Sequence, residues 1–164
     1  MTASAAAAAW PPLPLREWQD TRDTLHLWTQ IVGKTRLALA PAVNHWWHVP
    51  LYVSARGLTT SRMPYEDSGV SVELDFIDHA LVARRDDGRV WTTPLAPRSV
   101  ADFYRTYMSG LRSIGVDVRI WPVPVEIATP IPFAEDETHA SYDPAAAQRF
   151  WRALAQAARV LQTF

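Results

Sequence analysis

Residues 132–143 bring together residue types that enzymes use for proton transfer. Three consecutive acidic residues are followed by His139, Tyr142 and Asp143. An imidazole near a carboxylate can act as a general base or acid, and carboxylate oxygens also bind hard metal ions. We therefore predict a site on this segment, with His139 and Asp143 as catalytic residues and Tyr142 in contact with a ligand. The alternative is a solvated acidic loop in which Asp143 caps the helix that follows.

A second candidate segment has the sequence N-H-W-W-H and starts at Asn44. Its two histidines are three residues apart, which places them on one face of a helix but on opposite faces of a strand. We predict a catalytic role for His48 and ligand binding by Asn44, His45 and Trp46. A metal ion bound by His45, His48 and His139 is a further hypothesis, although no H-E-x-x-H spacing is present. The alternative is aromatic and imidazole packing at the start of a half-buried strand.

Three more polar side chains complete the predicted site. Gln30 and Lys34 are four residues apart in a helical pattern, so they face the same side and are well placed over a pocket. Lys34 or Arg56 could hold an anionic group of a substrate. The chain also has 8 Trp against 5 Tyr and 5 Phe, and tryptophan rings often wall binding pockets. The sequence thus predicts a polar pocket lined by tryptophan and histidine.

Composition and missing motifs exclude several classes of function. The chain has no cysteine, which excludes disulfides, thiolate zinc sites and iron–sulfur clusters. Its 16 Lys and Arg residues against 17 Asp and Glu give no basic excess, so we expect neither nucleic acid nor a membrane as a partner. Gly33-Lys34-Thr35 imitates the end of a P-loop, but Trp28 occupies the position of the first glycine. With no signal peptide or long apolar run, we expect a cytoplasmic protein.

The elements that position these residues follow from hydrophobic spacing. At 164 residues the chain is long enough for one domain. We predict an extended, proline-containing arm over residues 1–14 and a single domain over residues 15–164. Apolar residues at helical spacing predict a first helix from Arg16, with Gly33 as its end or a bend.

Later patterns predict strands and two further helices. Alternating residues predict strands at 47–54, 58–60, 70–76, 81–84, 90–93 and 116–120. Ser99 caps a second helix and Gly115 ends it, while Asp143 and Pro144 open a last helix whose buried side includes Leu154 and Leu161. Hairpin-connected strands with separate helices predict an α+β two-layer sandwich, in which an antiparallel meander packs against about three helices.

Five sequence blocks together resemble an uncharacterised bacterial family of unknown function. They are W-x-x-T-x-x-T-L-H-x-W-x-Q-I-V-G-K from Trp18, N-H-W-W-H from Asn44, R-G-L-T-T from Arg56, P-I-P-F from Pro130 and H-x-S-Y-D from His139. The resemblance implies a shared site but names neither its chemistry nor a cofactor. It also implies that the chain corresponds to the N-terminal half of longer members, whose second half is rich in His, Phe and Trp. We therefore expect the last helix to expose an apolar face that a second copy of the chain or another partner covers.

Three hypotheses of function fit these residues. The first is a small-molecule-binding domain with a pocket lined by tryptophan and histidine. The second is an enzyme that acts on a small polar or aromatic metabolite through histidine and carboxylate acid–base catalysis. The third is a protein that binds a metal ion through histidines. The sequence names no substrate and no cofactor for any of them.

Overall fold

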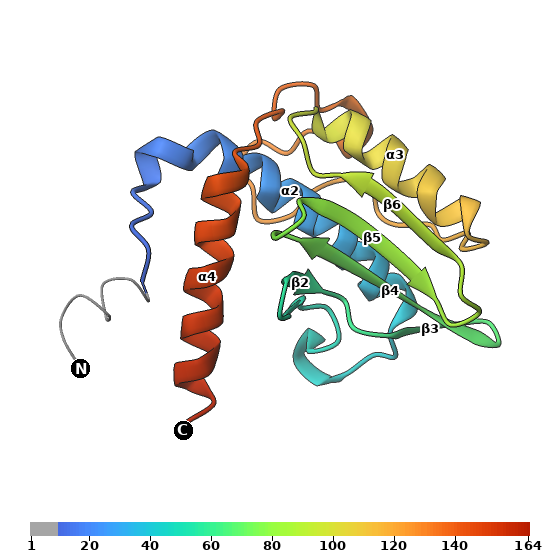
Figure 1. The fold of residues 1–164 in the computed structure, drawn as a ribbon. Helices are drawn as coiled ribbons and strands as arrows, with labels where there is room; N and C mark the ends of the chain where they lie inside the picture. Colours follow the sequence, from blue (N-terminus) through green and yellow to red (C-terminus); the bar gives the residue numbers. More distant parts are fainter. Residues whose placement is uncertain (1–9) are drawn as a thin grey trace.

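The computed structural model describes residues 10–164, and it shows an antiparallel sheet with two helices packed on one face (Figure 1). The six strands have the order β1-β2-β4-β5-β6, and β3 also pairs with β4. The predicted α+β class is therefore confirmed. Part of the predicted N-terminal arm, residues 1–9, lies outside the described residues, and residues 10–14 form neither helix nor strand.

The regular elements have the following bounds. The strands are β1 (Tyr52–Val53), β2 (Gly57–Thr59), β3 (Met63–Tyr65), β4 (Ser68–Asp75), β5 (Ala80–Arg85) and β6 (Val90–Pro94). The α-helices are α2 (Leu15–Leu39), α3 (Val100–Ser113) and α4 (Pro144–Leu161). Two short 3₁₀ helices, η1 (Asn44–Trp46) and η2 (Phe133–Glu135), lie in the connections.

The predicted helix ends are confirmed where capping chemistry defines them. The hydroxyl of Ser99 accepts a hydrogen bond from the backbone N–H of Asp102 and starts α3. Gly115 follows α3 with a φ of 79°, a conformation that glycine adopts without a Cβ clash. The Asp143 carboxylate accepts from the backbone N–H of Ala145 and starts α4. Each of these boundaries depends on residues adjacent in the sequence.

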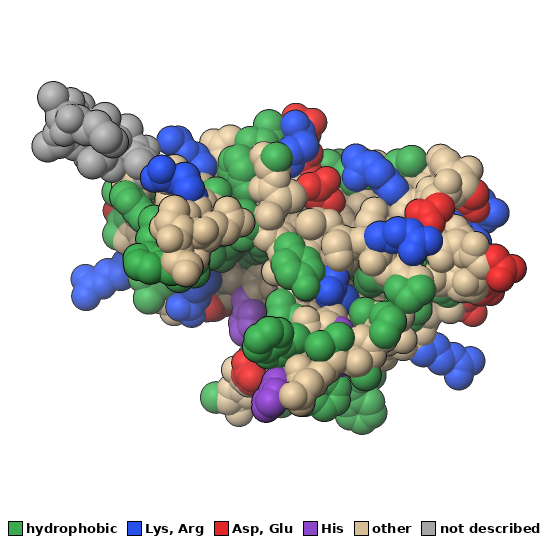
Figure 2. All heavy atoms as spheres, turned by 90° about the horizontal axis from the view of Figure 1, so that it is seen from below, with side chains coloured by type: hydrophobic (Ala, Val, Ile, Leu, Met, Phe, Trp, Pro, Cys, Tyr) green, Lys and Arg blue, Asp and Glu red, His purple; other side chains and the backbone are tan. Residues whose placement is uncertain are grey.

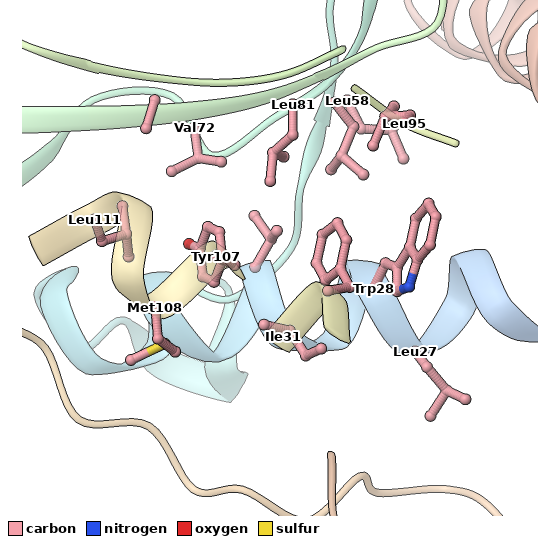
Figure 3. Close-up of a cluster of buried hydrophobic side chains, with 14 of the residues drawn as sticks. Leu27, Trp28, Ile31, Leu58, Val72, Leu81, Leu95, Tyr107, Met108 and Leu111 are labelled. Carbon is pink, nitrogen blue, oxygen red and sulfur yellow. The ribbon is translucent and has the colours of Figure 1, made fainter. Parts of the chain in front are cut away.

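The core lies between the sheet and the layer formed by α2 and α3 (Figure 3). Trp28 is fully buried and stacks on Phe103, with ring centroids 4.5 Å apart. Val72 and Leu81 point from the sheet towards the helix layer, whereas the buried Leu27 points away from the sheet on the opposite side of α2. Burial of a side chain of this size contributes about 1.5–3 kcal/mol, so this contact surface fixes α2 against the sheet.

Two predicted strands are wrong. Instead of a strand over 47–54, the chain turns after η1, where Trp47 has helical backbone angles (φ −64°, ψ −7°), and only Tyr52–Val53 form a strand, β1. Residues 116–120 form no strand, since no neighbouring strand pairs with them. Val116 and Val118 are buried, so their alternation reflects packing of one side of a connection against the core.

Helix α4 stands beside the sheet edge that carries β1 and β2 (Figure 1). It is attached near its start, where Ala147 is buried, and at Trp151, whose indole N–H donates to the carbonyl of Ser54 at 3.1 Å. The predicted burial of Leu161 is wrong, because its side chain is 72% exposed at the unsupported end of the helix. Within residues 10–164, no helix has the length and apolar character needed to cross a membrane.

Candidate functional site

A pocket of about 610 Å³ lies between α2, the start of α4 and the segments around β1 and β2. In the view of Figure 2, the surface is hollowed on the side where α4 stands beside the sheet. Pockets that bind small molecules have volumes of about 300–1,000 Å³ and mostly apolar walls. The pocket is lined by Trp18, Arg22, Leu25, His26, Thr29, Gln30, Gly33, Lys34, Leu37, Val49, Pro50, Leu51, Leu58, Val125 and Phe150.

One wall of the pocket is a row of polar side chains on α2. Arg22, His26, Gln30 and Lys34 follow one another at steps of four residues. Residues four apart lie on the same face of a helix, and each residue adds about 1.5 Å along the axis. The row therefore extends for about 18 Å along the pocket.

The opposite wall is apolar and comes from distant parts of the sequence. Residues 49–51 precede β1, Leu58 belongs to β2 and Phe150 to α4. Phe150 also packs on Trp18 of α2, with ring centroids 5.3 Å apart. This aromatic contact joins the two helices at one end of the pocket and leaves an apolar lining opposite the polar row.

Lys34 is the only lysine of the chain, and it is one of the residues that line this pocket. The residue is only 9% exposed, and no hydrogen bond or ion pair reaches its ammonium group from residues 10–164. Its nearest charge-related contact is the ring of Phe133, whose centroid is 6.0 Å from Nζ. Burial lowers the pKa of Lys34, because a desolvated ammonium is less stable than one in water.

Gln30 fixes the irregular connection that follows α3 against α2. Its amide donates to the carbonyl of Val125 at 2.8 Å and accepts from the N–H of Val125 at 2.9 Å. The same amide nitrogen lies 3.2 Å from His26 Nε2. Gln30 therefore has a structural role at the pocket rim. Lys34 differs from it, because its charge has no counter-charge among the described residues.

Gly33 lies inside α2 and lines the pocket next to Lys34. The helix continues through Gly33 to Leu39, so Gly33 is not the helix end. A Cβ placed on Gly33 would meet no heavy atom closer than the carbonyl oxygen of Val49 at 4.0 Å. Glycine in a helix interior costs about 1 kcal/mol relative to alanine. The backbone here tolerates a side chain, and its absence enlarges the pocket.

The acidic segment forms a cap for α3. Asp136 is 1% exposed, and one carboxylate oxygen accepts from the backbone N–H groups of Thr138 and His139. The other oxygen is 2.8 Å from His139 Nδ1. The carbonyls of Asp136 and His139 accept from the first N–H groups of α3, at Ala101 and Val100. These polar groups satisfy one another and the helix end.

Tyr142 and Asp143 are likewise held by structural contacts. The hydroxyl of Tyr142 is 2.9 Å from His79 Nδ1, and its ring stacks on Trp28. Burial raises the pKa of Tyr142, and the charges of Asp143 and Asp75 raise it further. The backbone N–H of Asp143 donates to the hydroxyl of Thr21, which ties the start of α4 to α2.

The segment from Asn44 lies outside the pocket. Asn44, His45 and Trp46 are exposed, with Trp46 at 68%. His48 is buried, and its Nδ1 accepts from the N–H of Val43 at 3.1 Å. The carbonyl of His48 also accepts from the guanidinium of Arg36, which donates as well to the carbonyl of Thr60. These contacts fix the connection between α2 and β1.

Arg56 binds two carboxylates and is not one of the residues that line the pocket. Its guanidinium is 2.5 Å from Asp75 and 2.6 Å from Asp78. Burial acts to raise the pKa of Asp75, but the hydrogen bonds from Arg56 and from the N–H groups of Asp78 and Ile77 outweigh it and lower that pKa. The anions that Arg56 binds in the structure are thus the carboxylates of Asp75 and Asp78, at the turn after β4, and not a ligand.

The structure does not bring the three predicted catalytic residues together. His48, His139 and Asp143 each have different hydrogen-bond partners, and none of the bonds in the described part of the chain joins two of them. Nor do residues 10–164 contain a group of three or more His, Asp or Glu side chains placed to hold a metal ion. Of the predicted site residues, Gln30 and Lys34 line the pocket.

Sequence reasoning missed the apolar wall and Gly33. Leu51, Leu58 and Phe150 come from three separate elements, and no local pattern indicates that they meet. A usable signal was the glycine itself, because helical spacing continues on both sides of Gly33. A glycine inside a continuous helical pattern can mark a place where the absence of a side chain leaves room for a pocket beside the helix.

The fold and the pocket define an α+β domain with a recess between its longest helix and the edge of its sheet. The chain belongs to DUF5996, a family of unknown function whose model matches residues 10–164. No curated protein and no solved structure matches the chain.

Proposed function

We propose that this domain binds a small molecule in the pocket between α2 and α4. The observation that carries the proposal is a recess of about 610 Å³ with an apolar wall and the buried Lys34, whose ammonium has no hydrogen-bond or ion-pair partner among residues 10–164. Folding does not favour a buried, unpaired charge, because desolvation costs free energy. A side chain kept in this state at a pocket wall is best explained by a ligand that pairs with it.

The acid–base and metal hypotheses have weaker support. The His139 imidazole does have an orienting carboxylate in Asp136, but that pair closes the start of α3 and lines no part of this pocket. His45 is exposed on η1, whereas the His48 ring accepts from a backbone N–H. Ligand binding at Lys34, in contrast, involves the charged group of the recess that has no counter-charge among the described residues.

The test is saturable binding of Nile red, an uncharged dye that fluoresces in apolar surroundings. Gly33→Leu places a side chain in the pocket, whereas Ala38→Leu adds the same side chain at an exposed position of α2 as a control. We expect one dye site in the wild type and in Ala38→Leu, and at least tenfold weaker binding in Gly33→Leu. Equal binding by both variants, or no saturable binding by the wild type, would overturn the proposal.

A further inference from the structure

We infer that the ligand of this pocket is an amphipathic carboxylate, with an apolar chain or ring system along the recess and its carboxylate at the Lys34 ammonium. The inference rests on the proposed function and specifies the chemical class of the ligand. It follows from the charges that line the pocket, the state of Lys34 and the shape of the apolar wall.

The charged lining has one sign. Arg22 and Lys34 are the charged side chains of the lining, and both are cations. No Asp or Glu is among the described residues that line the recess. A cationic ligand would meet repulsion here, and a neutral ligand would leave the ammonium without a counter-charge. Complementary charge therefore favours an anion.

Lys34 is the residue that holds the anion. The guanidinium of Arg22 is already hydrogen-bonded to Asp23 at 2.5 Å and its side chain is 43% exposed, so its charge is compensated within the protein and by solvent. Lys34 is buried and has no such partner among residues 10–164. A hydrogen bond between charged groups is about twice as strong as a neutral one, and it is strongest where water is excluded. Burial removes water from the ammonium, and a carboxylate at this position replaces that hydration with an ion pair.

The apolar wall requires that the remainder of the ligand be hydrophobic. Leu51, Leu58 and Phe150 line the recess from segments other than α2, which carries the polar row. The row is about 18 Å long, which favours an elongated molecule over a compact polar one. A sugar or nucleotide would bury hydroxyl groups against Leu and Phe side chains without partners, at a cost for each group. A fatty acid or an aromatic acid buries only apolar surface along this wall.

The experiment compares three ligands with the same ten-carbon chain. Decanoate, 1-decanol and decyltrimethylammonium compete with Nile red for the wild type, for Lys34→Met and for Lys34→Arg, all below micellar concentration. Methionine removes the charge and keeps an unbranched side chain, whereas arginine keeps the charge. For the wild type we expect decanoate to bind at least about tenfold more tightly than decanol, and the cation to bind most weakly. Lys34→Met should abolish this preference, and Lys34→Arg should retain a preference for decanoate.

The outcomes separate this inference from the proposed function. If decanol binds as tightly as decanoate while Gly33→Leu still blocks both, the pocket binds small molecules but the ligand class is wrong. A preference for decanoate that survives in Lys34→Met would also overturn the inference, because another group would then hold the anion. If no ligand or dye binds in a way that Gly33→Leu weakens, the proposed function itself fails.

Discussion

The pocket and the segment that caps α3 both concentrate polar side chains, but the partners of those side chains differ. In the cap, the Asp136 carboxylate receives hydrogen bonds from two backbone N–H groups and lies 2.8 Å from the imidazole of His139. In the pocket, the ammonium of the buried Lys34 donates no hydrogen bond to the described residues and forms no ion pair with them. In the cap, the buried charge has its partners within the chain. In the pocket, the buried charge has no counter-charge among the described residues.

The comparison teaches that residue type alone does not identify a site. His139 and Tyr142 have the functional groups of catalytic residues, yet each is engaged in holding neighbouring elements together. Buried polar groups are normally satisfied, so a buried charge that is unsatisfied needs an explanation. Stability measurements can distinguish the two cases, because removing a satisfied group should destabilise the fold and removing an unsatisfied charge should not.

The largest expected effect is in the cap. Asp136→Ala leaves two backbone N–H groups and the His139 ring without their acceptor, and we expect the free energy of unfolding to fall by about 3 kcal/mol. Urea denaturation measures this loss, and Nile red binding to the folded variant should be unchanged. A loss below 1 kcal/mol, or a selective loss of dye binding, would contradict the structural role of Asp136.

A second effect tests the carboxylate in the turn after β4 and its dependence on pH. Asp75→Asn should lower stability by about 1–2 kcal/mol near pH 7, because Asp75 accepts from Arg56 and from two backbone N–H groups. Folding lowers the pKa of Asp75, so its contribution is present above the ordinary value of 3.8 and is lost as the pH falls through the lowered pKa. Denaturation from pH 7 to pH 2 should therefore show a smaller acid destabilisation in the variant. Parallel curves for the two proteins would refute this assignment.

Unlike the two substitutions above, Lys34→Met should stabilise the protein. Removing the unpaired ammonium should raise the free energy of unfolding by about 1 kcal/mol at pH 7. The pKa of Lys34 is lowered in the folded protein, so the wild type gains stability as the pH rises towards 10.5, and the advantage of the variant should shrink over that range. Denaturation at pH 7 and pH 10 measures both quantities. If the variant is less stable than the wild type at pH 7, Lys34 has a partner that contributes to folding.

The smallest effect concerns the space beside Lys34. Gly33→Ala should stabilise the protein by about 0.5–1 kcal/mol, because alanine favours the helix and its Cβ meets no close atom. The same methyl group narrows the pocket, so affinity for decanoate should decrease. Thermal denaturation and the dye competition assay report these changes separately. A variant that is both less stable and unchanged in affinity would show that Gly33 is needed for packing, not for space.

Features that depend on neighbouring residues were predictable from the sequence. Ser99, Gly115 and Asp143 mark helix ends through contacts within a few positions, and all three predictions are confirmed. Two predicted strands are wrong. Val116 and Val118 alternate because one side of a connection packs on the core, not because a strand pairs there. In the segment 47–54, Trp47 is exposed and lies in a turn, and only Tyr52 and Val53 form a strand.

The site was only partly predictable for the same reason. Helical period placed Gln30 and Lys34 on one side of α2, and the structure shows both at the pocket. The opposite wall brings Leu58 together with Phe150, which are far apart in the sequence, and only tertiary packing joins them. Which polar residues already have partners is also a property of the folded chain, so the status of His139 could not be read from its type.

The state of Lys34 provides the most direct test of the account. Because Lys34 is the only lysine, protein labelled with [¹³C]lysine gives one set of side-chain signals, and the Cε shift follows the protonation of this ammonium alone. In the free protein we expect Lys34 to titrate below 10.5. Saturating decanoate should raise the pKa of Lys34, because the carboxylate pairs with the ammonium. A Lys34 that titrates at 10.5 or above, with a Cε signal that decanoate does not move, would contradict the claim that this buried ammonium pairs with an anionic ligand.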